Sequence, residues 1–135
     1  MADLRRFFVF STNEKTMTTV AASLAAANGR VVRSTTEAEF RYCLQQIAAF
    51  DAAIVDISAD QRHFEMVQEF VNHFPTKPLI AIVAAADLNA AMQAIRLGAT
   101  DYLLQPVLSE EVPEALERAM QLDLSPHFRI AQRLG

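Results

Sequence analysis

Five short apolar runs alternate along the chain with stretches in which apolar residues recur at helical spacing. The runs are residues 7–10, 31–32, 52–56, 78–83 and 102–104. Each run is short and nearly continuous in apolar character, which is typical of strands covered on both faces. Strands separated by helices pair in parallel, because parallel neighbours need a crossover connection. The pattern therefore predicts an α/β fold with one doubly wound, five-stranded parallel sheet.

Capping and stop residues mark the ends of the predicted helices. The pair Asn28-Gly29 is a stop signal for the first helix. Ser109 is expected to cap the last helix through its hydroxyl group. On the fourth helix, the helical spacing predicts Ala91 and Ile95 for the inner face, with Leu88 and Met92 as further candidates.

The bulk composition is that of one globular domain. The chain has 135 residues, is 52% hydrophobic and carries a net charge of −4. Its basic residues are scattered, so no direct contact with nucleic acid is expected. No stretch approaches the ~20 apolar residues of a membrane span, so no membrane contact is expected either. A single cysteine, Cys43, excludes an internal disulfide and favours a cytoplasmic location.

One acid stands where a buried strand is predicted to end. Asp56 closes the third apolar run, and open α/β sheets bind ligands at the carboxyl ends of their strands. The other strand ends carry no acid: they read Ser11-Thr12-Asn13, Val83-Ala84 and Gln105-Pro106. Asp56 is therefore the candidate reactive group. The plainer interpretation is that it caps the next turn or hydrogen-bonds Gln105 or Ser11.

No catalytic constellation is visible in the sequence. His63, His73 and His127 lack metal-ligand spacing and are expected at the surface or on helix faces. Cys43 falls on an apolar stripe and is expected to be a buried, inert thiol. The three glycines form no phosphate-binding loop. We therefore expect no enzymatic activity, and a small α/β enzyme of another class is the weakest alternative.

Three stretches resemble the receiver domains of response regulators. Residues 50–56 (Phe-Asp-Ala-Ala-Ile-Val-Asp) resemble the third strand of that family, which ends in the phospho-accepting aspartate. Residues 78–84 match its fourth strand, and residues 97–106 (Leu-Gly-Ala-Thr-Asp-Tyr-Leu-Leu-Gln-Pro) resemble the approach to its fifth. The resemblance implies the flavodoxin-like, CheY-like (βα)5 fold with strand order 2-1-3-4-5. It divides the chain into a receiver-like domain, residues 1–122, and a C-terminal extension or linker, residues 123–135.

The site residues depart from the family's pattern. In place of the two adjacent acids that hold Mg²⁺ in the family, the chain has Ser11-Thr12-Asn13, with Glu14 as the one acid nearby. The family's hydroxyl residue aligns with Val83, and its lysine aligns with Gln105. The resemblance therefore implies a vestigial phosphoacceptor site around Asp56. Mg²⁺ binding there would be weak, and no cofactor is expected unless Asp56 is phosphorylated.

These departures imply an atypical "pseudo-receiver" module of bacterial phosphorelay signalling that acts mainly through protein contacts. In the family, the face made by the fourth helix, fifth strand and fifth helix binds partners or forms dimers. Here Asn89, Gln93, Arg96 and Tyr102 are the expected contacts on that face. The expected partners are another protein or a second copy, with an output domain in cis or in trans. Such domains also stand at the front of longer proteins, including ATPases of Flp/Tad pilus assembly. The main alternative is a working receiver that a histidine kinase phosphorylates on Asp56.

Overall fold

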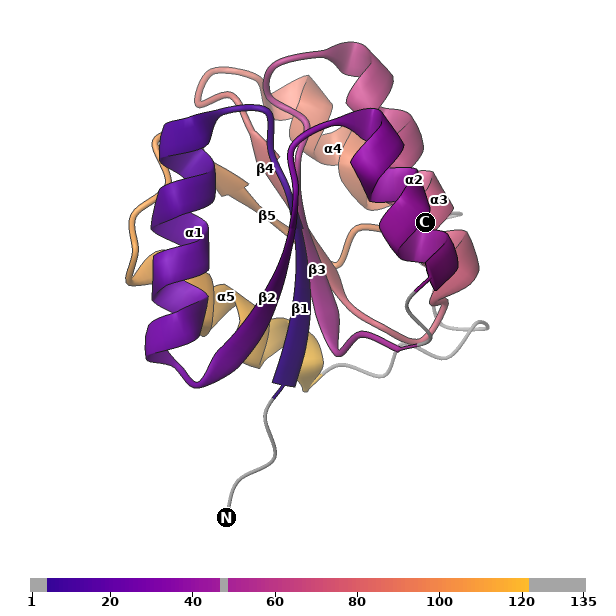
Figure 1. The fold of residues 1–135 in the computed structure, drawn as a ribbon. Helices are drawn as coiled ribbons and strands as arrows, with labels where there is room; N and C mark the ends of the chain where they lie inside the picture. The colour runs from indigo at the N-terminus through magenta and orange to yellow at the C-terminus, as the bar shows by residue number, and fades with distance from the viewer. Residues whose placement is uncertain (1–4, 47–48, 122–135) are drawn as a thin grey trace.

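The computed structural model describes residues 5–46 and 49–121, and these residues form one parallel sheet with helices on both faces. The strands pair in the order β2-β1-β3-β4-β5, and every pair is parallel (Figure 1). This order confirms the predicted doubly wound sheet. The strands are β1 (Arg5–Phe10), β2 (Gly29–Ser34), β3 (Ala52–Asp56), β4 (Leu79–Val83) and β5 (Asp101–Leu104).

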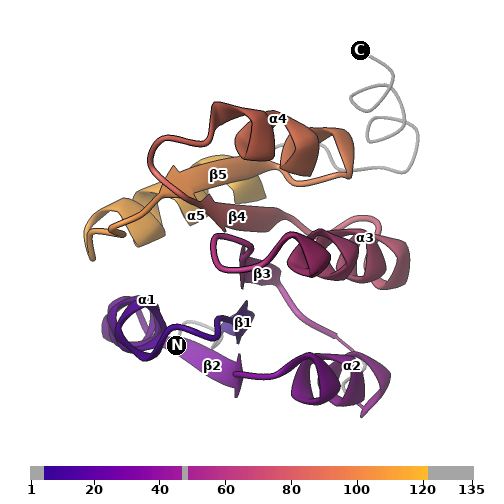
Figure 2. The ribbon, with the colours of Figure 1, turned by 90° about the horizontal axis from the view of Figure 1, so that it is seen from above.

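In the described residues, four α-helices and one 3₁₀ turn connect the strands, and a fifth α-helix follows the last strand. Helices α1 and α5 cover one face of the sheet, and α2, α3 and α4 cover the other (Figure 2). A layer of helices on each face is what right-handed parallel crossovers produce when the chain reverses direction across the sheet. The elements are α1 (Glu14–Ala26), α2 (Glu37–Gln46), η1 (Gln61–His63), α3 (Phe64–His73), α4 (Leu88–Arg96) and α5 (Glu111–Met120).

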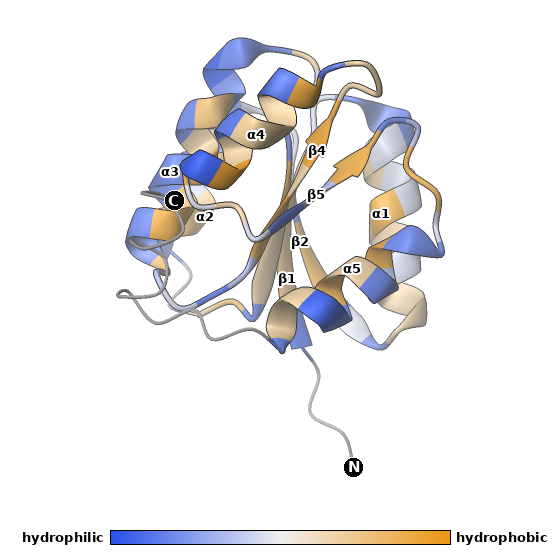
Figure 3. Ribbon diagram, turned by 180° about the vertical axis from the view of Figure 1, so that it is seen from behind, coloured by the Kyte–Doolittle hydropathy of each residue, from blue (hydrophilic) through white to orange (hydrophobic). Residues whose placement is uncertain are grey.

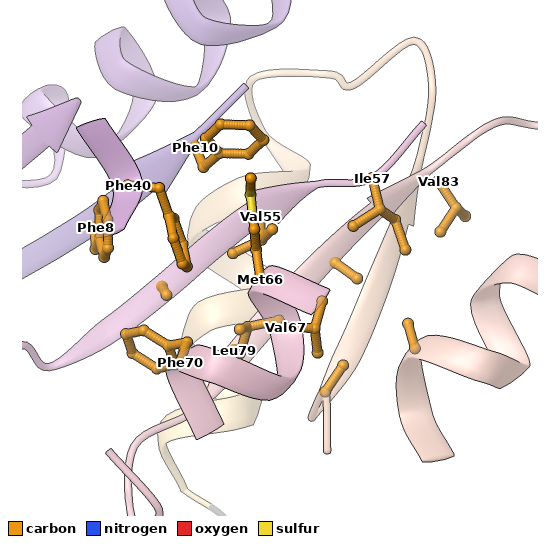
Figure 4. Close-up of a cluster of buried hydrophobic side chains, with 14 of the residues drawn as sticks. Phe8, Phe10, Phe40, Val55, Ile57, Met66, Val67, Phe70, Leu79 and Val83 are labelled. Carbon is orange, nitrogen blue, oxygen red and sulfur yellow. The ribbon is translucent and has the colours of Figure 1, made fainter. Parts of the chain in front are cut away.

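Two hydrophobic clusters lie on the two faces of the sheet. The larger one, under α2, α3 and α4, is built around stacked phenylalanine rings (Figure 4). Phe8 of β1 belongs to it, with its ring centroid 4.9 Å from those of both Phe40 and Phe50. The smaller cluster fills the space between the sheet and helices α1 and α5. The strands carry most of the hydrophobic colour in Figure 3, whereas the helices alternate between hydrophobic and hydrophilic residues, as elements with one buried side do.

Two of the predicted helix ends differ in the structure. Helix α1 ends at Ala26, and Asn28 takes the left-handed conformation (φ 63°) that the sequence pattern favours for glycine. Gly29 instead begins β2, where a Cβ atom would lie 2.6 Å from the Phe7 ring. Ser109 does not cap α5, which begins at Glu111; the Glu111 carboxylate accepts the backbone N–H of Leu108 at 3.0 Å.

The inner face of α4 confirms the prediction for Ala91 and Ile95, which pack on the larger core cluster. Ala91 and Ala94 are buried against the sheet, whereas Leu88 and Met92 are 64% and 47% exposed. The prediction for Leu88 and Met92 was therefore wrong. The reason is rotational: Leu88 and Met92, four residues apart, share a side of α4 that is turned away from the one carrying Ala91 and Ala94, and α4 packs on the sheet through the alanines.

Replacing Gly98 by alanine is expected to destabilise the domain by about 1–3 kcal/mol. Gly98 ends α4 with φ 116°, and a Cβ atom there would lie 2.9 Å from Cγ1 of Val71. The matched variant Asn28→Gly should stabilise the domain, because Asn28 has a positive φ and glycine adopts a positive φ without steric cost. Urea denaturation of both variants checks the pair. Equal stability of Gly98→Ala and the unchanged domain would contradict the geometry at this turn.

Candidate functional site

Asp56 lies at the carboxyl end of β3, in the middle of the sheet. Its side chain is 1% exposed. Parallel pairing of β1 with β3 sets Phe10 beside Val55, so Ser11 follows directly beside Asp56. On the other side, Asp56 pairs with Ile82 of β4. The strand register thus brings the ends of β1, β3 and β4 together at the place that the sequence predicted.

Both carboxylate oxygens of Asp56 accept short hydrogen bonds. The Ser11 hydroxyl donates to Oδ2 at 2.7 Å. The Ser58 hydroxyl and backbone N–H both donate to Oδ1, at 2.6 and 2.9 Å. The bonds from Ser58 form an Asx turn, in which a carboxylate caps the backbone two residues on. The plainer interpretation of Asp56, as a turn-capping and hydrogen-bonded acid, is therefore confirmed.

Gln105 joins this carboxylate to helix α1. Its Nε2 lies 3.5 Å from Asp56 Oδ2, 3.3 Å from Ser58 Oγ and 3.0 Å from Thr16 Oγ1. Thr16, in the first turn of α1, is only 6% exposed. The set Ser11, Thr16, Asp56, Ser58 and Gln105 is called the Asp56 network below. It contains one ionisable side chain and four neutral ones.

The other predicted members of the site have separate roles. Asn13 caps α1 by accepting the N–H of Thr16 at 3.0 Å, and its own N–H donates to Ser11 Oγ at 3.0 Å. Thr12 is exposed, and Val83 is buried in the larger core cluster. Neither contacts Asp56 by a hydrogen bond in the described part of the chain.

Sequence reasoning missed the hydroxyl groups of Thr16 and Ser58. The sequence does hold a signal for Thr16, because this residue comes three positions after Asn13, the residue that caps α1. A polar side chain in the first turn of this helix lies near the ends of the strands. Its partner, Gln105, lies 89 residues away, so local sequence does not reveal the contact.

The donor set of the Asp56 network does not fit Mg²⁺. A hard dication prefers several carboxylate or carbonyl oxygens, and Asp56 is the only carboxylate in the network. Glu14 is exposed and makes no side-chain bond to the network. No group of three or more His, Cys, Asp and Glu side chains could hold a metal within residues 5–46 and 49–121. The donors to Asp56 are hydroxyl and amide groups of Ser11, Ser58 and Gln105.

A groove of about 490 Å³ opens beside the network, between α1 and the segment that follows β5. Its lining combines Lys15 and Thr19 of α1 with Ala85, Pro106 and Val107. Lys15 is exposed, and no ion pair joins it to a described acid. The groove exposes Thr16, Ser58 and Gln105 of the network to a ligand.

Helix α4 separates the predicted interaction residues. Asn89 and Gln93 line a cavity of about 210 Å³ that they share with Asp60 and Phe64, so they lie on the α3 side of α4. Tyr102 is half-buried and packs against the larger core cluster from β5. Arg96, at the end of α4, is exposed.

Four exposed apolar side chains lie on the opposite side of α4 and beyond β5. Leu88 and Met92, one turn apart, share the side of α4 that faces away from α3. Leu104 pairs in register with Val83 and so lies on the same face of the sheet as α4. The set is called the apolar face below: Leu88 (64% exposed), Met92 (47%), Leu104 (42%) and Leu108 (52%).

His63 is buried, so its expected surface position was wrong. Its ring packs edge-on against Phe10, and its Nε2 lies 3.6 Å from a carboxylate oxygen of Glu37. His73 is exposed as expected, and His127 lies outside the described residues, as does the segment 123–135. Cys43 is partly buried, and this burial raises the pKa of its thiol.

Asp60 caps the turn η1. Its carboxylate accepts the backbone N–H of Arg62 at 2.9 Å and forms an ion pair with the Arg62 guanidinium at 2.8 Å. The side-chain and backbone hydrogen bonds from Arg62 lower the pKa of Asp60 to about 2. Because folding lowers the pKa of Asp60, the cap stabilises the fold at pH values above 3.8, the ordinary pKa of an aspartate. This contribution is lost as the pH falls from 3.8 toward 2.

Comparisons with known proteins agree with this architecture. No family model matches the chain. The regulatory protein AtoC of Escherichia coli K12 is 30% identical over 73 residues, which are 53% of this chain and 16% of AtoC. The DNA-binding transcriptional regulator NtrC of Proteus hauseri is 34% identical over 71 residues, which are 52% of this chain and 15% of NtrC. The chain therefore spans less than a fifth of either curated relative.

The fold also matches solved structures along most of its length. A response regulator from Thermotoga maritima superposes with a TM-score of 0.79 and 18% identity, over 89% of this chain and 100% of that one. Within the described residues, no helix is long and apolar enough to cross a membrane. Taken with the strand order, these matches show that the chain has the CheY-like fold of response-regulator receiver domains, and that about half of it is similar in sequence to the regulators AtoC and NtrC.

Proposed function

We propose that this chain is an atypical receiver domain that acts through protein contacts, with little or no Mg²⁺-dependent phosphorylation of Asp56. The observation that carries the proposal is the Asp56 network. Both carboxylate oxygens are held by hydroxyl and amide donors from Ser11, Ser58 and Gln105. A carboxylate in such a network is a structural acceptor rather than an exposed nucleophile.

Electrostatics support the same conclusion. A phosphoryl group adds a charge of about −1.5 to −2, and phosphoryl transfer depends on cations that offset this charge. The neighbours of Asp56 within the network are neutral, and the family's lysine position is occupied by Gln105. At the family's hydroxyl position, Val83 is buried and has no donor. Among the described residues, the network thus holds no second carboxylate and no cationic side chain, and the family's hydroxyl position is apolar.

The apolar face is the proposed contact surface. Exposed apolar side chains that gather on one surface often mark protein interaction sites. Leu88 and Met92 contribute from α4, and Leu104 and Leu108 contribute from β5 and the segment after it. We take a second copy of this chain as the first partner to test. Because the curated relatives are much longer, an output domain in cis or in trans is the second proposed partner.

The alternative function is that of a working phospho-receiver. It is favoured by one observation, the retention of an aspartate at the end of β3. The two functions differ in what controls association: the proposed module associates without phosphate, whereas the working receiver associates after Asp56 is modified.

Sedimentation velocity over a concentration series, with and without acetyl phosphate and Mg²⁺, tests the proposal. We expect self-association that the phosphodonor does not change and that Leu88→Asp weakens by at least about tenfold, because a charge replaces a central apolar contact. The matched control, Tyr42→Asp, places the same charge at an exposed apolar side chain on α2, away from the apolar face, and should leave association intact. Association that appears only with acetyl phosphate and is absent in Asp56→Ala would support the alternative. A domain that stays monomeric throughout would exclude the second copy as the partner.

A further inference from the structure

The Asp56 network joins segments that are far apart in the sequence. Ser11 follows β1, Thr16 lies in α1, Asp56 and Ser58 lie at the end of β3, and Gln105 follows β5. Its long-range bonds connect positions 45 to 89 residues apart. Such bonds restrict the relative movement of the elements that they link, because Ser11, Thr16 and Asp56 are buried and exchange their partners for water less readily than exposed groups do.

Gln105 holds the segment that connects β5 to α5. Its side chain contacts Thr16, Ser58 and Asp56, and its backbone N–H donates to the carbonyl of Val83 at 2.9 Å. Further along the segment, the carbonyl of Ser109 accepts the Ser23 hydroxyl at 2.6 Å. Residues 105–109 are therefore attached to α1, β3 and β4 from two points.

This segment borders the apolar face. Leu104 directly precedes Gln105, and Leu108 lies between the two attachment points. Both leucine side chains are about half exposed to solvent, at 42% and 52%. Exposed leucines keep a defined position only if the backbone that carries them is fixed, and the network supplies that fixation.

We infer that the Asp56 network is a lock, which holds residues 105–109, and with them Leu104 and Leu108, in one conformation without any bound cation. Gln105 and Thr16 are its positioning residues. The inference rests on the proposed function, since it gives the unphosphorylated site a structural role. Asp56 is the one charged member, and neutral donors satisfy it, so the lock is independent of divalent ions.

Native-state hydrogen exchange of the backbone amides of residues 105 and 107–110 tests the lock. Removing the Thr16 hydroxyl with Thr16→Val should speed exchange in this segment by about tenfold, the effect of losing a buried hydrogen bond and leaving its partner unpaired. Gln105→Ala should have at least the same effect. Thr16→Ser keeps the hydroxyl and should restore slow exchange. In the unchanged protein, Mg²⁺ and a chelator should give the same rates.

The matched control is Thr18→Val, because the Thr18 hydroxyl donates within α1 to the carbonyl of Glu14 at 2.9 Å and does not reach the network. In Thr18→Val, the exchange rates of the amides of residues 105 and 107–110 should equal those of the unchanged protein. Rates that are equal in Thr16→Val, Gln105→Ala and the unchanged protein would overturn the lock, as would slower exchange on adding Mg²⁺. Thr16→Val replaces a hydroxyl with a methyl group of nearly equal size and is therefore expected to fold. It tests the lock even if Gln105→Ala does not fold. Phosphorylation of Asp56, by contrast, would refute the proposed function without altering this comparison.

Discussion

Asp56→Ala is expected to destabilise the domain by about 2–4 kcal/mol, because it removes the shared acceptor of a buried network. The hydroxyls of Ser11 and Ser58 and the amide of Gln105 would lose their common partner in a site that is 1% exposed. An uncompensated buried acid would behave in the opposite way, since its removal would relieve a desolvation cost. The sign of the change therefore separates a structural carboxylate from a strained reactive one.

Urea denaturation with and without Mg²⁺ measures this effect. We expect a lower midpoint for Asp56→Ala, an intermediate one for Asp56→Asn, which keeps one acceptor oxygen, and no dependence of the unchanged domain on Mg²⁺. A rise in stability for Asp56→Ala, or a strong stabilisation of the unchanged domain by Mg²⁺, would contradict the network's role.

Phe8→Ala should lower the free energy of unfolding by about 3–5 kcal/mol. The Phe8 ring is 1% exposed and stacks on Phe40 and Phe50, so its loss leaves a cavity in the larger core cluster. A domain of this size has a total stability of about 5–15 kcal/mol, so the variant is expected to be partly unfolded at physiological temperature.

Tyr42→Ala is the matched control for Phe8→Ala. Tyr42 is 65% exposed on α2, so its truncation should change stability by less than about 0.5 kcal/mol. Thermal denaturation of both variants, followed by circular dichroism, gives the comparison. A loss below about 1 kcal/mol for Phe8→Ala would mean that the core collapses around the cavity, contrary to the packing of the three stacked rings.

The sheet was predictable from the sequence because its signal is local. Apolar runs that alternate with helical spacing require parallel strands and crossovers, and the β3 run ending in Asp56 has this form. The strand order came from the family resemblance, since periodicity alone does not say which strands are neighbours. The Asx turn at Asp56 was within reach of sequence reasoning as well, because its partner, Ser58, is two residues away.

The side-chain contacts of the Asp56 network, the buried face of α4 and the position of His63 depend on contacts between distant residues. Thr16 and Gln105 meet only after α1 and β5 are placed, and the hydrogen bond needs particular side-chain rotamers. Leu88 and Met92 have apolar character that favours burial, but α4 turns its alanines to the sheet. His63 is buried because η1 brings its ring against Phe10, a contact that hydropathy and spacing do not reveal.

Intact-mass measurement after incubation with acetyl phosphate and Mg²⁺ tests most directly whether Asp56 remains unphosphorylated. The Asp56→Ala variant, treated identically, is the reference. The Asp56 network predicts that the unchanged protein keeps its mass, because its carboxylate oxygens are occupied and its surroundings hold no metal ligand set. A gain of one phosphoryl group that requires Mg²⁺ and is absent from Asp56→Ala would contradict this account and make the domain a working receiver.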